Sequence, residues 1–226
     1  MGTNQKNMNY DIQKAKNLYE KGLCYINGDD CEKDLDVALS YFIQSVWCGN
    51  AQAARNVGIL LSSDEIKNPD LEEAFWYFLH AAKHGDNVAQ LNVGKYFSKM
   101  GDFKDLDYPP YNMYTANIWF EKAANAGNIR AAFLYGVHLL EGSGCAQDIQ
   151  KAIQYFEFGA KKGHVGCMYN LGIIYHGKAF GLFYVDENKA GYWFNMAAQN
   201  GDKQAMEMLN MYKYSKLTKR WSQKSN

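Results

Sequence analysis

Few residues in this sequence have a type and spacing that would support chemistry. His80 and His84 are four positions apart, so on a helix both imidazoles would project from one face and could bind a metal ion. No third histidine follows, and no glutamate between them supplies the base of a metalloprotease. A protonated His84 would also suit the negative end of a helix. We therefore interpret the pair as structural and expect no metal ion.

The five cysteines do not form a recognisable metal-binding or disulfide pattern. Their number is odd, no CxxC pair occurs, and Cys24 and Cys31 are separated by seven positions. The remaining three, Cys48, Cys145 and Cys167, are isolated. This pattern favours reduced, buried thiols.

Other signatures of catalysis are missing from the sequence. It contains no Walker loop, dinucleotide-binding fingerprint or nucleophile elbow. The neighbouring carboxylates of Asp64-Glu65 and Glu72-Glu73 would point in different directions from a helix and indicate a solvated surface. We predict that the protein is not an enzyme and uses no cofactor.

Composition excludes two further classes of function. The 226 residues include 24 acidic and 24 basic side chains, which argues against a general nucleic-acid surface. No run approaches the roughly 18 to 20 apolar residues that cross a bilayer, so we expect no integral membrane association. The polar N-terminus has no apolar signal-peptide segment, and the expected location is the cytoplasm.

The chain is instead organised by a repeat, which is clearest in residues 70–94. Marker alanines recur at steps of 36, 42, 36 and 38 residues: Ala38, Ala74, Ala116, Ala152 and Ala190. Each is followed by two adjacent aromatic residues: Tyr41-Phe42, Tyr77-Phe78, Trp119-Phe120, Tyr155-Phe156 and Trp193-Phe194. A glycine lies eleven positions after each alanine: Gly49, Gly85, Gly127, Gly163 and Gly201. An Asp or Asn lies four positions before it: Asp34, Asp70, Asn112, Asp148 and Asp186.

These offsets predict a helix of about 14 residues in every unit. Asp and Asn are preferred N-caps, the alanine and aromatics share one apolar face, and the glycine ends the helix in a left-handed conformation. Between these helices the sequence predicts another helix, which is the first of each pair. It carries a glycine at a constant offset: Gly58, Gly94, Gly136 and Gly172. Since glycine costs a helix roughly 1 kcal/mol relative to alanine, its recurrence indicates close packing of a neighbouring helix.

The pattern resembles the Sel-one-like repeat family, relatives of the tetratricopeptide repeats. Residues 143–172 match the family signature at Asp148, Lys151-Ala152, Tyr155-Phe156, Gly163 and Leu171-Gly172. The first unit departs from it, with Ser45-Val46 in place of Ala-Ala and no Leu-Gly pair in its first helix. A secreted branch of the family joins its helices by disulfides, but Gly159 offers Cys167 no partner at the expected spacing.

The resemblance implies an all-α fold, a right-handed α-solenoid of antiparallel helix pairs with about five repeats. We expect residues 1–9 to be a flexible terminus or an expression remnant, 10–212 a single solenoid and 214–226 a basic tail. The expected units are 10–49, 50–85, 86–127, 128–163 and 164–201, followed by a capping helix at 202–213. In the first helix, Lys14, Lys16 and Lys21 would form the polar outer face of a terminal repeat.

Two loops and the tail are open to more than one interpretation. Tyr108 and Tyr111 flank consecutive prolines in the loop 101–112, which is either a recognition element or, as we favour, a long loop folded against its own repeat. In the loop 177–187, aromatic and aliphatic residues form either an exposed interaction patch or a cover for the end of the core. The basic tail 214–226 could contact an acidic partner or anionic lipid, but we favour a solvated terminus.

The function favoured by this fold is binding of an unidentified protein or peptide by the first helix of each pair. The trend along these helices from polar to apolar suggests an apolar segment as the ligand, although packing between repeats explains part of it. The candidate partner-binding residues are Arg55, Ile59, Leu91, Lys95, Phe133, Val137, Tyr169, Ile173, Phe180, Phe183 and Tyr184.

We predict a non-enzymatic adaptor or scaffold that acts as a monomer. The alternatives are an immunity or inhibitor protein that neutralises a bacterial toxin or effector, as the resemblance suggests, and a homo-oligomeric structural module.

Overall fold

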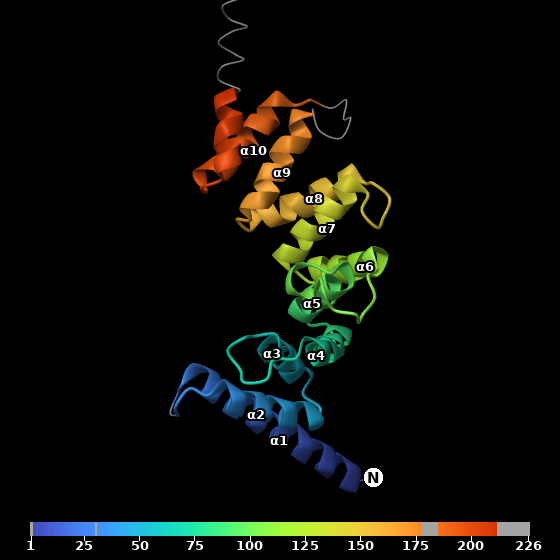
Figure 1. Ribbon diagram of the computed structural model, residues 1–226, viewed down its shortest axis with the longest axis vertical. Coiled ribbons are helices and arrows are strands. Elements are labelled where there is room, and N and C mark those ends of the chain that lie inside the picture. Colours follow the sequence, from blue (N-terminus) through green and yellow to red (C-terminus); the bar gives the residue numbers. More distant parts are fainter. Residues whose placement is uncertain (1, 30, 178–184, 212–226) are drawn as a thin grey trace, which may run out of the picture. The chain divides into compact units, whose positions relative to one another are not determined.

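The computed structural model is all-α within the residues that it describes, which are 2–29, 31–177 and 185–211 (Figure 1). One compact unit contains three helix pairs: α1 (Gly2–Asn27) with α2 (Leu35–Trp47), α3 (Ala51–Leu61) with α4 (Leu71–Lys83), and α5 (Asn87–Ser98) with α6 (Met113–Asn125). A short 3₁₀ helix, η1 (Gly101–Phe103), follows α5. A second unit contains α7 (Ile129–Glu141) with α8 (Ile149–Lys161), and α9 (Val165–His176) with α10 (Glu187–Gln199). Residues 203–211 are again helical. The predicted repeat of helix pairs is confirmed.

Each pair is held by a glycine of the first helix against a phenylalanine ring of the second. The pairs are Gly22–Phe42, Gly58–Phe78, Gly94–Phe120, Gly136–Phe156 and Gly172–Phe194. A methyl group on any of these glycines would lie 2.5–2.8 Å from a ring carbon, closer than real side chains approach. The predicted close packing at four glycines is confirmed. Gly22 fills the same place in the first pair, although a lysine precedes it where the other units have an apolar or aromatic residue.

The first helix pair also adapts where its sequence departs from the repeat. Ser45 takes the place of an alanine and is completely buried. Its hydroxyl donates a hydrogen bond to the carbonyl oxygen of Ala15 at 2.7 Å, which satisfies a polar group in an apolar contact. Gly159 of α8 leaves room for the buried sulfur of Cys167 on α9, which occupies the space that a methyl group at position 159 would need. Burial raises the pKa of the Cys167 thiol to about 12, so the thiol stays neutral.

Both ends of the second helices are closed as predicted. The side chains of Asp34, Asp70, Asn112, Asp148 and Asp186 each accept a hydrogen bond from a backbone N–H three positions later, at 2.8–3.0 Å. Their own backbone N–H groups donate to carbonyls of the preceding helix, as from Asp70 to Leu61 at 2.9 Å. Each cap therefore also anchors the loop that leads to it. The five terminal glycines have φ between 86° and 94°, the left-handed conformation that glycine adopts without strain.

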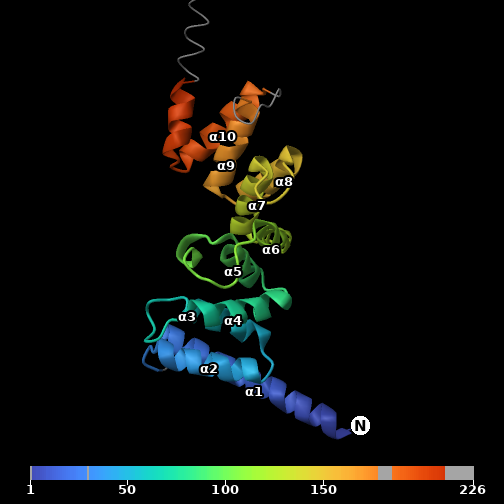
Figure 2. The ribbon, with the colours of Figure 1, turned by 45° about the vertical axis from the view of Figure 1, so that its right-hand side comes forward.

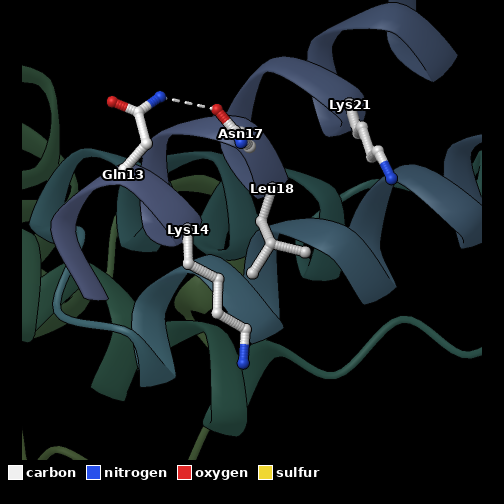
Figure 3. Close-up of a pocket in the computed structure, with 5 residues that line it drawn as sticks. All are labelled: Gln13, Lys14, Asn17, Leu18 and Lys21. Atoms are coloured by element: carbon white, nitrogen blue, oxygen red, sulfur yellow. Dashed lines mark hydrogen bonds between the residues drawn. The ribbon is translucent and has the colours of Figure 1, made fainter. Parts of the chain in front are cut away.

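Helix α1 begins at Gly2, before the first apolar position of the pattern, and is therefore longer than expected. Its outer side carries a shallow pocket of about 240 Å³, lined by Gln13, Lys14, Asn17, Leu18 and Lys21 (Figure 3). The Gln13 side-chain amide donates to the Asn17 carbonyl oxygen at 2.8 Å. Lys14, Lys16 and Lys21 are exposed. The outer face of α1 is polar, as expected of a terminal repeat.

The glycine–phenylalanine contact leads to a matched pair of substitutions. Gly58→Ala should lower the free energy of unfolding by about 1–2 kcal/mol, because overpacking against Phe78 outweighs the gain in helix propensity. Gly191→Ala is the control, since nothing lies within 4 Å of its missing methyl group in α10. The control should raise stability by about 0.5–1 kcal/mol, and urea unfolding measures both. Equal effects of the two changes would contradict the packing role.

The cap of α9 makes stability depend on pH. The Nδ1 atom of His164 accepts a hydrogen bond from the backbone N–H of Cys167 at 3.2 Å, which only a neutral imidazole can do. Burial, and then the charge of Arg130, lower the pKa of His164. Below its ordinary pKa of 6.5 the unfolded chain therefore takes up the proton first. This contribution to stability is complete above that value and is lost as the pH falls through the lower folded pKa.

We expect His164→Asn, which keeps an acceptor but does not titrate, to flatten the decline in Tm between about pH 7 and pH 5. The pKa values of His80 and His138 are also lowered by burial, but both residues are present in the two proteins and affect them alike. Parallel curves of Tm against pH for the wild type and the variant would refute the role of His164.

Candidate functional site

Most of the candidate residues on α3 and α5 are buried, partly buried or already engaged in an ion pair. Arg55 forms an ion pair with Asp86, with Nη1 and Oδ2 3.2 Å apart. Leu91 is only 4% exposed, and Lys95 is partly buried. Ile59 is the exposed apolar side chain of this group, at 45%. These first helices therefore present little apolar surface to a partner.

In the second unit, the candidates on α7 and α9 are partly buried. Phe133 packs against the ring of His164, with centroids 4.8 Å apart, and against the backbone of Gly166. Tyr169 packs on Phe194 at 5.9 Å. Both aromatic residues thus contribute to packing between helices, which was the alternative explanation of the apolar trend. Val137 and Ile173 are also partly buried, whereas Phe180, Phe183 and Tyr184 lie outside the described residues.

Among residues 2–29, 31–177 and 185–211, no group of three or more His, Cys, Asp or Glu side chains could hold a metal ion. The rings of His80 and His84 are near each other, with centroids 4.7 Å apart. The Nδ1 atom of His84 is 2.9 Å from the carbonyl oxygen of His80, a contact within one helix turn. In the same described ranges, no helix is long and apolar enough to span a membrane.

The loop 101–112 packs against α5 of its own repeat, as we favoured, and also against α4 of the preceding repeat. Pro109 is fully buried, and Phe103 stacks on Tyr96 with centroids 3.9 Å apart. The Tyr96 hydroxyl donates to the carbonyl oxygen of Leu71 at 2.7 Å, and burial raises the pKa of Tyr96 to about 12. The ammonium group of Lys99 donates to the Leu106 carbonyl at 2.6 Å. These contacts fix the path of a loop that has little regular structure.

This fixed loop places Tyr108 on Trp76 of α4. The two rings are stacked, with centroids 5.4 Å apart and an angle of 20° between their planes. Tyr108 also meets the edge of the buried Phe75 at 5.6 Å. Trp76 nevertheless remains 55% exposed and Tyr108 45% exposed. We call Trp76 and Tyr108 the aromatic pair; it is a large apolar surface on a firmly held backbone.

Trp76 was not among the residues that we selected from the sequence. It lies two positions after the marker alanine Ala74, on the solvent-facing side of the second helix of its pair. The equivalent residues are Ser40, Ile118, Gln154 and Tyr192. A tryptophan at a solvent-facing position, with tyrosines beside the prolines of the next loop, was the signal that could have identified the pair.

Acidic residues gather in the loops that join the helices of each pair in the first unit. Segments 29–36, 64–73 and 99–107, without Asp30, contain twelve acidic residues and four lysines. The first two loops meet where Lys33 pairs with Glu65 at 4.0 Å and where the Lys67 backbone N–H donates to Asp36 at 3.1 Å. All three loops project on the left-hand side of Figure 2. We call these segments the acidic edge.

The second unit contains a groove of about 870 Å³ beside α8. Ile149, Ile153 and Ile174 supply apolar side chains, and Gln150 and Lys189 lie among the polar residues that line it. The Lys189 ammonium lies over the ring of Tyr175 at 4.9 Å. None of the candidate residues on α7 or α9 lines this groove.

Comparison with known proteins identifies the family. A profile of the Sel1 repeat matches residues 4–23, 22–46, 51–86, 87–128, 129–164 and 165–202. The chain belongs to the Sel1 repeat family. The profile finds six repeats where we expected about five, because the first expected unit, 10–49, contains most of two matches.

Relatives with this repeat include both named regulators and solved structures. Chitin synthase regulatory factor 2 of Schizosaccharomyces pombe is 33% identical over 140 residues, which cover 61% of this chain and 27% of that protein. A Sel1 repeat protein from Oxalobacter formigenes has a TM-score of 0.70 at 26% identity, covering 86% of this chain and 76% of the other. A protective antigen of uropathogenic Escherichia coli with an SLR fold reaches a TM-score of 0.79 at 21% identity, covering 89% and 42%, which shows the fold alone. The chain spans 15–27% of the length of the curated relatives that it matches.

The Sel1 repeats also bring two thiols together. The sulfur atoms of Cys24, at the end of α1, and Cys31, in the following loop, are 3.2 Å apart. Both side chains are partly exposed, whereas Cys167 is the buried free thiol among the five. The expectation of buried thiols is therefore wrong for Cys24, Cys31, Cys48 and Cys145, which are all partly exposed because they lie in or beside loops at the helix ends.

This proximity predicts selective oxidation by diamide. Cys24 and Cys31 should form a disulfide, with loss of two protons and two electrons to the diazene, because the attacking sulfur is already beside its target. Peptide mass spectrometry after blocking the remaining thiols would detect the 24–31 link. Cys48 and Cys145 serve as internal controls and should stay alkylated at times when the link is complete. Random pairing among the four exposed thiols would contradict the prediction.

Proposed function

We propose that this Sel1 repeat protein is a non-enzymatic regulator that binds another protein. The observation that carries the proposal is the aromatic pair, in which Trp76 and Tyr108 are exposed although the loop beneath them is fixed by buried contacts. Tryptophan and tyrosine dominate the energetics of many protein interfaces, and side chains that are already ordered lose little entropy on binding. Such a surface suits recognition of a partner.

One further observation supports this function. The relative from Schizosaccharomyces pombe is named as a regulatory factor of chitin synthase, which is consistent with a role in which one protein controls another. We take the protein to act as a monomeric adaptor in the cytoplasm, with the partly buried Val137 and Ile173 as the second candidate surface.

The test is capture of a partner by the tagged full-length protein from cells that express it. We expect one protein in near-stoichiometric yield. Trp76→Ala/Tyr108→Ala should reduce that yield more than tenfold, as expected for interface residues worth 2 kcal/mol or more. Trp47→Ala is the matched control, because Trp47 is 79% exposed but lies at the opposite end of its helix pair from the acidic edge.

A third variant, Val137→Asp/Ile173→Asp, tests the surface that the sequence suggested. Phe133 is left unchanged in this variant, because its ring packs on Gly166 and its substitution would disturb the fold. Loss of the partner only in this variant would move the site to the second unit. Equal recovery of the partner by all variants, each shown to be folded by circular dichroism, would overturn both surfaces.

A further inference from the structure

We infer that the aromatic pair and the acidic edge together bind an arginine-rich segment of a partner protein. This inference rests on the protein-binding function proposed above and specifies the chemistry of what is bound. It follows from two independent features of the first unit, an open stacking surface and a one-sided distribution of charge.

The stacking surface is only partly covered by its neighbours, since Trp76 contacts the rings of Tyr108 and Phe75 and stays 55% exposed. Tyr108 lies against Trp76 with nearly parallel rings, so it covers one face of the indole. More than half of the Trp76 side chain is still exposed, which leaves area for a second planar group. An arginine guanidinium is planar, weakly hydrated and always charged, and it stacks on indole more favourably than a lysine ammonium does.

The charge beside this surface is negative. Glu72 precedes Trp76 by four positions on α4, so both side chains occupy the same helix face, and Asp107 is adjacent to Tyr108. Lys104 lies near Asp105 at 3.8 Å, but both groups are mostly exposed, and such pairs contribute little. With twelve acidic residues to four lysines, the acidic edge retains a strong negative potential.

The opposite edge of the same unit shows that the charge is not a general property of its loops. The segments 47–51, 83–87 and 125–128, which connect successive pairs, contain one lysine, Lys83, and one acidic residue, Asp86. Asp86 caps α5 and pairs with Arg55, so structural contacts account for it. Several carboxylates of the acidic edge, by contrast, serve neither as caps nor in an ion pair within the described residues, as at Glu72 and Asp107.

These features distinguish the proposed ligand from other segments. A polyproline segment would stack on the aromatic pair but would gain nothing from the carboxylates. A lysine-rich segment would be attracted by the charge but would use the indole less well. Nucleic acid and anionic lipid would be repelled. An arginine-rich segment uses both features.

The experiment measures fluorescence anisotropy of fluorescein-labelled octapeptides of arginine, lysine and proline with the full-length protein. Octaarginine should bind most tightly. Trp76→Ala/Tyr108→Ala should weaken octaarginine binding about 2- to 30-fold, the range expected for cation–π contacts, and should remove the preference for arginine over lysine. Trp47→Ala should leave both affinities unchanged.

Charge is tested separately with two triple variants. Glu72→Gln/Asp105→Asn/Asp107→Asn should weaken octaarginine and octalysine alike and reduce the dependence of binding on salt. Glu141→Gln/Glu187→Gln/Glu207→Gln removes three exposed charges from the second unit and is the matched control. Equal effects of the two triple variants, or no effect of the aromatic variant, would reduce the binding to general charge attraction and overturn the inference.

The partner captured by the wild type separates this inference from the proposed function. Saturating octaarginine should displace that partner. A partner that is lost in Trp76→Ala/Tyr108→Ala but is retained in the presence of octaarginine, or displaced only by octaproline, would remove the inference and leave the protein-binding function standing. Failure to capture any partner, together with tight and selective octaarginine binding, would instead count against the wider function.

Discussion

The architecture depends on one contact, that of a helical glycine with a phenylalanine ring. The ring occupies the volume that a methyl group would need, so the two helices of a pair approach more closely than alanine would permit. Glycine weakens each first helix in isolation, and the dispersion and burial gained by the ring must offset that loss. Because the contact recurs in all five pairs from α1–α2 to α9–α10, the same constraint sets the spacing throughout both units.

This contact also determines which surfaces remain for recognition. Glycine faces of the first helices and the alanine–phenylalanine faces of the second are committed to the core. Positions that border these faces are also committed: Phe133 and Tyr169 pack against rings of neighbouring helices, and Leu91 is buried. The outward positions of the second helices are under no such constraint. Their side chains vary from Ser40 to Trp76, and variation at a fixed place on a constant scaffold allows a repeat to acquire a specific surface.

The caps and packing glycines were predictable because each residue type recurred at a constant offset and has a definite physical role there. Gly22 escaped notice because a lysine precedes it and hides the motif, although it contacts Phe42 just as the later glycines contact their rings. The aromatic pair was less accessible to sequence. Trp76 and Tyr108 are brought together by a loop whose path depends on tertiary contacts and not on periodicity. The burial of Leu91 was likewise not evident from the repeat pattern.

The third repeat shows how an irregular segment can be stable enough to present side chains. Its spacing is the longest in the array, at 42 residues, and the additional chain lies in the loop 101–112. Lys99 begins this excursion with φ of 54°, which costs a residue other than glycine about 1–2 kcal/mol. The hydrogen bond from the Lys99 ammonium to the Leu106 carbonyl oxygen and the burial of Phe103 and Pro109 offset that cost. The buried residues of the loop therefore fix its conformation. As a result, the aromatic ring that it presents at the surface is held in place before any partner binds. A binding surface gains affinity from such preorganisation, whereas a loop that only connects two helices has no need of it.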